Sequence, residues 1–593
     1  MSEATKLRKF IVSTFSLNGF TIQERACAYL VQQLEPLESI EDRDQWLDKI
    51  VDYVRVSSTN DGNIVTYELL SKALKFCCNL QILNDEDILH VTSAYKLPCY
   101  RYCPTTKKFQ RIMSVTSMFG DAQSKISQYS TRYTVIRQRM ARIKTLTDGT
   151  LNQPLTIGDK IRDVDYLLSS GACRKFDRNS KSDSILLLGF LVQLKEGGRY
   201  HLEDPTGAIP LDISETDFQK GYFTENCCVL AEGRFCSDRR VFFVTNMALP
   251  PSERAEISKI YFGESNNFSD KNDLSLKSCN PKLLEYEKRK NRMIIFVSDV
   301  FLDNPKVLKK FHTLLTSFND LAPVAIVMMG DFLSCHVPSH AYAQELKTHL
   351  TQLGHFLHDN TPGLCKHTMF VLLPGPGDRY SGAAGASILP RPLIPEFLTE
   401  EFRRLVPRCV FTTNPCRMQY CTQQIHILRA DGLMKKTANY DIRHGSMDRK
   451  KSPTVIESDD DIIKNYIKTL ESQSHLITVP LDVCPTYWPL APHSLNLYPM
   501  PDLVCIADAN APEYSTIGSN HSDSSNSKIL SSTGCIFFNP SSFSKNKYSF
   551  SVYITAQRLI EDSNLPDDEY DAGISLMDSE DTVATVGNRR KHN

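Results

Sequence analysis

The stretch that decides the fold is Arg292-Met293-Ile294-Ile295-Phe296-Val297-Ser298-Asp299, an apolar run that predicts a buried strand ending on a carboxylate. The same pattern recurs along the chain. The further runs are Val324–Met329 before Gly330-Asp331, Met369–Leu373 before Pro374-Gly375-Pro376-Gly377-Asp378, Leu503–Ala507 before Asp508, and Cys535–Phe538 before Asn539-Pro540-Ser541-Ser542. Strands this apolar predict an α/β sheet covered on both faces.

Such sheets place functional side chains beyond the carboxyl ends of their strands, so the acidic ends are expected to gather on one rim. The order of these strand ends resembles the calcineurin-like metallophosphoesterases, whose motifs run D-x-H, G-D-x-x-D/N, G-N-H-D/E, a lone His, and G-H-x-H. That chemistry needs two cations, a bridging carboxylate, several imidazoles and a His that protonates the leaving oxygen.

Most of those groups are replaced in this chain. Phe301 stands where the D-x-H motif has its His, and we expect its ring to pack as a core residue at the rim. Pro376 and Gly377 stand where G-N-H-D has its Asn and His. The positions that the resemblance marks as vestigial are Asp299, Phe301, Asp331, Pro376, Gly377, Asp378, His475, Asp508 and Asn510. We therefore expect no catalytic residue, no metal site and no cofactor, and we interpret the remaining carboxylates as turn and cap residues.

Composition bounds the remaining possibilities. The 593 residues predict several domains, and 68 basic against 69 acidic side chains give a net charge of −1 that indicates neither nucleic acid nor membrane as a global partner. The 18 cysteines form no C-x-x-C pair and favour reduced core residues. The N-terminus lacks a signal-peptide core, and an intracellular protein is expected.

The first part of the chain has helical periodicity. Residues 1–92 predict a small helical bundle, with a capping box at Thr21-x-x-Glu24 and an apolar stripe at Leu70, Ala73 and Leu74. Residues 93–180 predict a basic linker with one helix at about 121–142, and this linker is a candidate for weak or indirect DNA contact.

Short strands follow at 185–194, 200–203, 208–213, 229–235 and 241–247, which suits an OB-type barrel over residues 181–255. Because Glu203, Asp204 and Asp212 are acidic, a barrel that docks protein is favoured over one that binds single strands. The sheet domain is expected at 290–560, with disordered loops at 431–461 and 515–532 and a disordered tail at 561–593.

A helical bundle, an OB barrel and a phosphoesterase sheet without its imidazoles resemble, in that order, the B-subunits of the eukaryotic replicative DNA polymerases, and within them the polymerase epsilon branch. The stretches that carry the resemblance are 193–197 with 202–207, 229–233, 387–392, 410–423 and 498–503.

The resemblance implies a nuclear, non-catalytic accessory subunit of DNA replication. Its partners would be the C-terminal, metal-binding region of the catalytic subunit of DNA polymerase epsilon, the small accessory polymerase subunits, and the GINS part of the replicative helicase, which residues 1–92 would contact through an AAA+ lid-like bundle. Two alternatives stay open: a phosphoesterase with an atypical metal set of Asp299, Asp331, Asp378 and His475, and a free-standing DNA-binding scaffold.

Overall fold

The structure is a computed structural model whose chain divides into two compact units, Met1–Ile88 and Leu89–Asn593. It describes residues 3–34, 43, 46–48, 50–51, 53–54, 64–79, 88–112, 120–143, 157–169, 184–194, 198–263, 281–380, 388–443, 458–487, 493–517 and 529–566.

The first unit is built around helices. Its elements are α1 (Glu3–Leu17), β1 (Thr21–Ile22), α2 (Glu24–Leu34), β2 (Ile64–Val65) and α4 (Tyr67–Asn79). The predicted apolar stripe of α4 is buried, and Leu70 and Ala73 are fully covered. The prediction of a capping box at Thr21 was wrong. Thr21 lies in β1 and pairs with Ile64 of β2 instead of capping α2.

The second unit contains a closed barrel. Its strands are β6 (Ile161–Arg162), β7 (Ile185–Gln193), β8 (Tyr200–Asp204), β9 (Gly207–Asp212), β10 (Asp217–Phe218), β11 (Cys228–Cys236) and β12 (Val241–Ala248). Parallel pairing of β9 with β12, with Leu211 opposite Phe242, closes it. Asp204 holds the β8–β9 turn because its Oδ1 accepts hydrogen bonds from the N–H groups of Thr206 (2.7 Å) and Gly207 (3.0 Å). The predicted OB-type barrel is confirmed.

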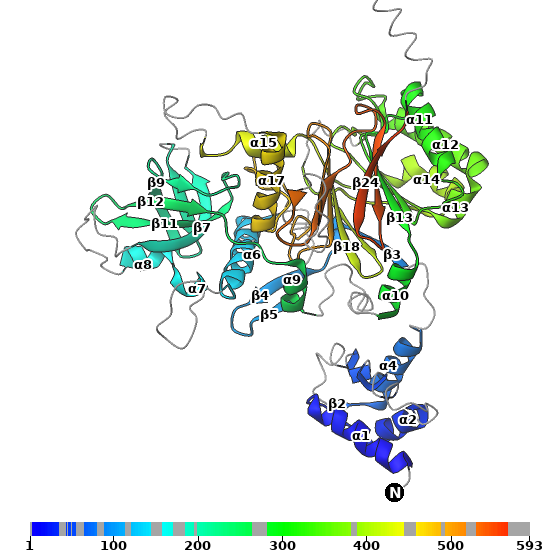
Figure 1. Cartoon of the computed structure of the whole chain (residues 1–593), viewed down its shortest axis with the longest axis horizontal. Helices are drawn as coiled ribbons and strands as arrows, with labels where there is room; N and C mark the ends of the chain where they lie inside the picture. The colour runs from blue at the N-terminus through cyan, green and yellow to red at the C-terminus, as the bar shows by residue number, and fades with distance from the viewer. Residues whose placement is uncertain are drawn as a thin grey trace, which may run out of the picture. The chain divides into compact units, whose positions relative to one another are not determined.

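Two mixed sheets follow, and they lie side by side in Figure 1. The six-stranded sheet has the order β16 (Cys409–Phe411), β15 (Met369–Leu373), β14 (Ala325–Met329), β13 (Met293–Ser298), β23 (Ser549–Ile554) and β24 (Leu559–Asn564). The seven-stranded sheet has the order β21 (Ile529–Leu530), β20 (Tyr514–Ile517), β22 (Ile536–Asn539), β19 (Leu503–Asp508), β18 (Gln423–Ala430), β17 (Cys416–Tyr420) and β3 (Leu89–Ser93). Phe296 of β13 meets Phe538 of β22 edge to face at 5.0 Å between ring centroids, so apolar side chains join the two sheets.

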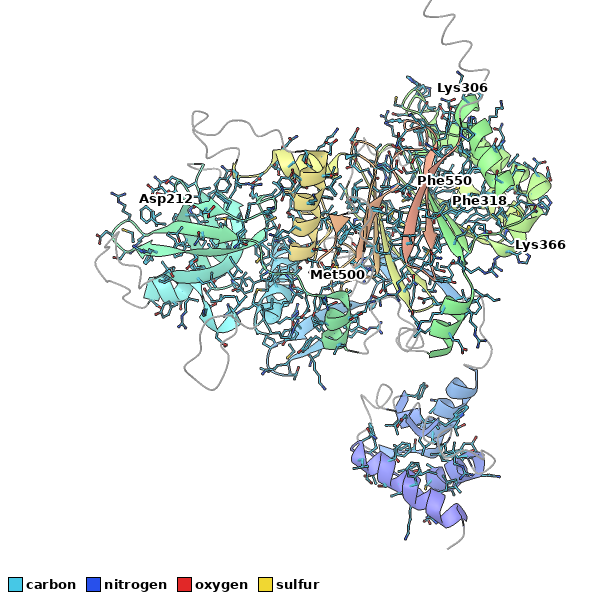
Figure 2. The ribbon with its side chains drawn as sticks, viewed as in Figure 1. Asp212, Lys306, Phe318, Lys366, Met500 and Phe550 are labelled. Atoms are coloured by element: carbon cyan, nitrogen blue, oxygen red, sulfur yellow. The ribbon has the colours of Figure 1, made fainter. Side chains whose placement is uncertain are left out.

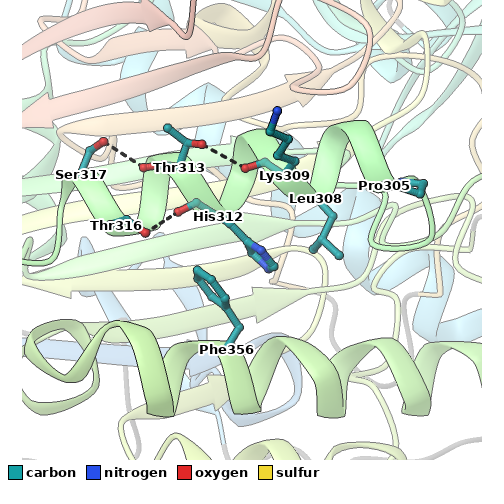
Figure 3. A pocket seen from close by; sticks show the side chains of 8 residues that line it. All are labelled: Pro305, Leu308, Lys309, His312, Thr313, Thr316, Ser317 and Phe356. Carbon is teal, nitrogen blue, oxygen red and sulfur yellow. Dashed lines mark hydrogen bonds between the residues drawn. The ribbon is translucent and has the colours of Figure 1, made fainter. Parts of the chain in front are cut away.

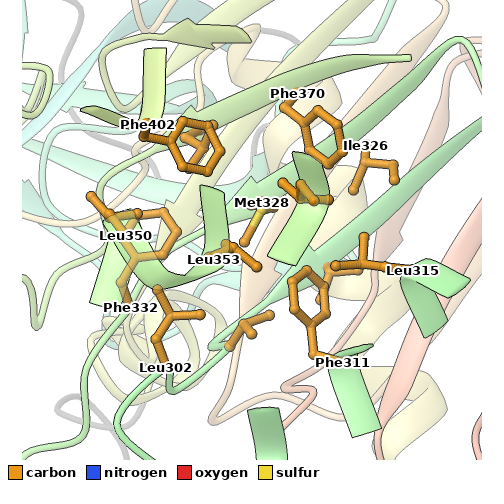
Figure 4. Packing of buried hydrophobic residues seen from close by; sticks show 14 of the residues in the cluster. Leu302, Phe311, Leu315, Ile326, Met328, Phe332, Leu350, Leu353, Phe370 and Phe402 are labelled. Atoms are coloured by element: carbon orange, nitrogen blue, oxygen red, sulfur yellow. The ribbon is translucent and has the colours of Figure 1, made fainter. Parts of the chain in front are cut away.

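Helices cover the outer face of each sheet (Figure 1). The six-stranded sheet is covered by α11 (Pro305–Ser317), α12 (Tyr342–Asn360), α13 (Pro362–His367) and α14 (Glu396–Leu405), and the seven-stranded sheet by α15 (Leu433–Asn439) and α17 (Asp459–Gln473). Figure 4 shows Met328 and Phe370 of the sheet packed among Phe311, Leu353 and Phe402 of the helices. Directly after the C-terminal end of α11, the ring of Phe318 meets that of Phe550 of β23 at 6.2 Å between centroids (Figure 2). These layers fit the phosphoesterase-like α/β sandwich expected from the sequence.

The segment expected to be a linker is folded into the second unit. It contributes β3, η1 (Ala94–Lys96), β4 (Cys99–Cys103), β5 (Lys108–Ile112), α6 (Ala122–Met140), α7 (Ile157–Lys160) and α8 (Val164–Ser169). The predicted helix is α6, but Tyr133, Ile136 and Met140 bury it against the barrel. Strand β3 pairs with β17, so the boundary expected after residue 92 cuts through a sheet strand.

The loops expected to be disordered are also partly ordered. Helix α15 lies inside the predicted 431–461 loop and buries Leu433 and Met434, and β20 and β21 occupy the ends of the predicted 515–532 loop. Residues 444–457, 518–528 and 567–593 lie outside the described residues, whereas β24 extends into the predicted tail as far as Asn564. Helices α9 (Ala255–Phe262) and α10 (Pro281–Arg289) precede the sheets, and within the described part no helix is both long and apolar enough for a membrane span.

Candidate functional site: a closed carboxylate rim

The acidic strand ends meet at one rim, as the sequence predicts. In the six-stranded sheet, Ser298 of β13 is in register with Met329 of β14, which is in register with Leu373 of β15. Asp299 and Asp331 therefore leave adjacent strands, and the Asp331 N–H donates to Asp299 Oδ1 at 3.1 Å. Asp299 has a left-handed backbone, with φ 54°, and is 1% exposed. The parallel register brings these carboxylates within reach of one shared partner.

That partner is Arg429, at the end of β18 in the opposite sheet. Its Nη2 and Nε donate to Asp299 Oδ1 at 2.5 and 3.1 Å, and Nη2 lies 3.8 Å from Asp331 Oδ2. The guanidinium also donates to the carbonyl oxygens of Gly330 (2.6 Å) and Ala507 (3.2 Å). With its side chain only 3% exposed, Arg429 is an internal cation that joins the two sheets.

Asp378 closes the rim beside β15 through hydrogen bonds to both carboxylate oxygens. Oδ1 accepts from the Phe332 N–H (2.9 Å) and the Tyr342 hydroxyl (2.5 Å), and Oδ2 accepts from the Gly375 N–H (2.7 Å). Asp378 is fully buried. It therefore anchors the turn that precedes it.

The Pro374–Gly377 turn carries glycine because it lies directly against Asp331. The Gly377 N–H donates to Asp331 Oδ1 at 2.6 Å, and a Cβ on Gly377 would lie 2.6 Å from Asp331 Oδ2. A Cβ on Gly375 would lie 2.4 Å from the backbone carbon of Gly330. The loops after β14 and β15 are thus packed on one another. Pro376 between these glycines is half-buried.

Asp508 and Asn510 connect the rim to the seven-stranded sheet. Asp508 is in register with Ala430, and its Oδ1 accepts from the N–H groups of Gly432 (2.8 Å) and Asn510 (3.0 Å). Asn510 Nδ2 donates to Asp431 Oδ1 at 2.6 Å. Both side chains thus fix the turn that follows β18.

Two of the sequence-predicted positions lie elsewhere. Val300 and Leu302 are 1% exposed, whereas Phe301 between them is half-buried, so the expectation that it packs as a core residue at the rim was wrong. His475 follows α17, where its Nδ1 lies 2.7 Å from the Ile477 carbonyl oxygen. Burial, with Arg132 nearby, holds the pKa of His475 well below its ordinary value, so the ring is neutral.

The charges at the rim are shifted by burial. Burial and the neighbouring Asp378 raise the pKa of Asp331 from 3.8 to about 7, although Arg429 acts in the opposite direction. Burial also raises the pKa of Asp378. For Arg429, burial works against the charge, but Asp299 and Asp331 outweigh it and raise its pKa, so the guanidinium stays charged.

These residues do not fit a two-metal centre. The guanidinium of Arg429 occupies the space between Asp299 and Asp331 that cations would need, and Asp378 has both oxygens engaged by donors. Arg429 was missed by the sequence analysis. The available signal was a single cation at the end of Gln423–Ala430, a strand in which every residue is buried.

Away from the rim, a surface pocket of about 600 Å³ lies between α11 and α12. Its lining residues include Leu308, His312 and Phe356. The rings of His312 and Phe356 stack at 3.5 Å between centroids (Figure 3). None of its lining residues is a predicted site residue.

Comparison with known proteins matches the three parts in order. The family of the B subunits of DNA polymerases alpha and epsilon matches residues 294–516, the OB-fold domain of proteins like DNA polymerase epsilon subunit 2 matches 122–251, and the N-terminal domain of DNA polymerases epsilon matches 3–77. DNA polymerase epsilon subunit 2 of Bos taurus is 34% identical over 568 residues, covering 94% of this chain and 99% of that protein. The DNA polymerase epsilon B subunit of Saccharomyces cerevisiae is 26% identical, covering 74% of this chain and 69% of that protein.

Among solved structures, the match to TT1561 of Thermus thermophilus spans 46% of this chain and 99% of that chain, at 13% identity and a TM-score of 0.20. The matches over the OB barrel and the two-sheet domain place the chain in the class of DNA polymerase B subunits. Within that class, the chain belongs to the DNA polymerase epsilon subunit 2 family. It is an accessory, non-catalytic subunit of that polymerase, as the sequence analysis predicted.

Proposed function

We propose that the barrel and the two-sheet domain act as one rigid binding platform in the nucleus. The platform binds the C-terminal, metal-binding region of the polymerase's catalytic subunit. The observation that carries the proposal is the set of buried polar contacts between the two domains. Arg139 of α6 is 1% exposed and donates to Ser474 Oγ at 2.7 Å and to the Ser472 carbonyl at 2.5 Å. Gln473 exchanges hydrogen bonds with the backbone of Cys228 at 2.7 and 2.8 Å. Such contacts favour a fixed geometry between barrel and sheets.

A groove of about 900 Å³ runs where α6, the β7–β8 face of the barrel and the loop at Pro480–Asp482 meet. Its exposed apolar side chains are Ile126 (57% exposed) and Leu194 (49% exposed). Its charged residues are Lys125, Glu203, Asp204, Glu225 and Asp482, so carboxylates predominate. A partner segment that combines apolar and basic side chains complements this lining.

The test is copurification of the full chain with the C-terminal region of the catalytic subunit. The double substitution Ile126→Asp with Leu194→Asp should raise the dissociation constant about tenfold or more, because exposed apolar anchors carry most of the binding energy of an interface. Leu321→Asp is the matched control, since Leu321 is 62% exposed and does not line the groove. Equal binding by both variants would remove the groove from the proposal.

The first unit is proposed to contact the GINS part of the replicative helicase. On α1, Phe10 (39% exposed) and Leu17 (84% exposed) are seven residues apart and so share one face. Phe10→Asp with Leu17→Asp should lose GINS in a pull-down and keep the catalytic subunit, while Gln32→Asp on the exposed part of α2 should keep both. Loss of both partners together would show that the two functions are not separate. The small accessory polymerase subunits remain proposed partners without an assigned surface.

A further inference from the structure

The β4–β5 hairpin is a strongly basic surface on a near-neutral chain. No acidic residue occurs from Ile88 to Gly120, whereas Lys96, Arg101, Lys107, Lys108 and Arg111 all lie in that stretch. All five of these side chains are exposed. In a chain whose net charge is −1, this is a local concentration of positive charge.

The structure separates the basic residues of this region into two groups. Three arginines of α6 and the residues after it are used internally: Arg137 pairs with Asp163, Arg139 donates to the chain after α17, and Arg142 pairs with Glu253 at 2.7 Å. Those at the tip of the hairpin, Lys107 and Lys108, have no ion pair among the described residues. The three arginines therefore stabilise the fold, whereas Lys107 and Lys108 face solvent.

Aromatic packing holds one face of the hairpin against the rest of the unit, and on the other face Arg101 donates to Ser127 Oγ of α6 at 2.9 Å. Tyr100 and Phe109 meet Phe262 of α9 at 5.2 and 4.7 Å between ring centroids, and Phe109 stacks on Tyr498 at 5.4 Å. Figure 1 shows β4 and β5 as a separate ribbon beside α6 and α9. Because side chains alternate along a strand, the opposite face carries Arg101, Lys108 and Gln110 together with Cys99, Cys103 and Ile112.

That outer face presents cations close together. Arg101 is opposite Gln110, and Cys103 is opposite Lys108. Arg101 and Lys108 are therefore diagonal neighbours on one face, at about 7–8 Å. The tip adds Lys107 and the hydroxyl groups of Thr105 and Thr106, all exposed.

We propose that the β4–β5 hairpin binds the phosphate backbone of DNA without reading its sequence. The alternative occupant, an acidic protein segment, fits less well. Protein interfaces are depleted in Lys at their centres and need apolar anchors, and the described hairpin residues include no exposed large apolar side chain. Interfaces with nucleic acid are polar and strongly positive, as this face is. The inference does not depend on the proposed binding platform for the catalytic subunit.

The test measures binding of the full chain to short fluorescein-labelled duplex DNA and to single-stranded DNA across a range of salt concentrations. Lys107→Glu with Lys108→Glu should weaken binding roughly tenfold and lower the slope of log K against log salt by about 2, one for each lost phosphate contact. If only one DNA form shows the loss, that form is the ligand.

A matched control exists in the barrel. Arg239→Glu with Arg240→Glu makes the same charge change at the β11–β12 turn, where Arg240 has φ 50° and Lys107 of the hairpin has φ 53°. This variant should bind DNA as the parent does. Equal weakening by both variants, or by neither, would overturn the inference. So would a hairpin variant that keeps DNA but loses the catalytic subunit, because the hairpin would then be a protein contact.

Discussion

Replacing Arg429 by Met should destabilise the second unit far more than the loss of an ordinary surface ion pair. The substitution keeps an unbranched apolar chain but leaves Asp299, which is 1% exposed, and Asp331, which is 22% exposed at its side chain, without their cation. Breaking a buried pair by removing one partner costs about 3–5 kcal/mol, because the remaining charge is uncompensated. The carbonyl oxygens of Gly330 and Ala507 lose a donor as well.

Arg404→Met is the control, since Arg404 pairs with Glu401 at 2.8 Å but its side chain is 71% exposed. An exposed pair of this kind contributes about 0–1 kcal/mol. The free energy of unfolding is best obtained from native-state hydrogen exchange of the slowest amides of β13, β14, β18 and β19, because a chain of two units does not unfold in one step. Adding Asp299→Asn to Arg429→Met should recover part of the loss. The reasoning is refuted if Arg429→Met and Arg404→Met cost the same.

Three further outcomes are expected. Since burial raises the pKa of Asp331 to about 7, the folded state holds its proton more tightly than the unfolded chain, so unfolding free energy should fall as pH rises from about 4 to about 7, by up to about 1.4 kcal/mol per pH unit, and Asp331→Asn should flatten that profile. Residues 89–593 should be soluble, whereas residues 94–593 should aggregate because β17 loses its edge partner β3; equal solubility would contradict this. Phosphoesters should not be hydrolysed above background with Mn²⁺ or Zn²⁺, and turnover that an Asp299→Ala, Asp331→Ala variant abolishes would count against this expectation.

The buried strands and the barrel were predictable because their signals are local. An apolar run that stops at Asp, Gly-Asp, Pro-Gly or Asn-Pro identifies β13, β14, β15, β19 and β22 within a few residues, since a strand buried on both faces tolerates almost no polar residue before its end. The Asp204 turn is equally local, because the carboxylate binds backbone two and three residues ahead.

The closure of the rim was not predictable in that way. Arg429 is 130 residues from Asp299, and nothing near either residue indicates the other. Strand β3 was interpreted as part of a bundle and linker because its partner β17 lies in a distant part of the chain. Phe301 was expected inside, but the left-handed backbone at Asp299 turns the chain so that Val300 and Leu302 take the buried positions.

The buried guanidinium of Arg429 gives the rim a structural role. A metal centre needs ligand oxygens that face an open site, whereas here Asp299 Oδ1, Asp331 Oδ1 and both oxygens of Asp378 accept from Arg429, backbone N–H groups or the Tyr342 hydroxyl. The loops after β13, β14 and β15 are thereby tied to the end of β18 in the other sheet. A guanidinium bound through several donors fixes orientation as well as distance. The carboxylates at the strand ends therefore hold the two sheets together through Arg429.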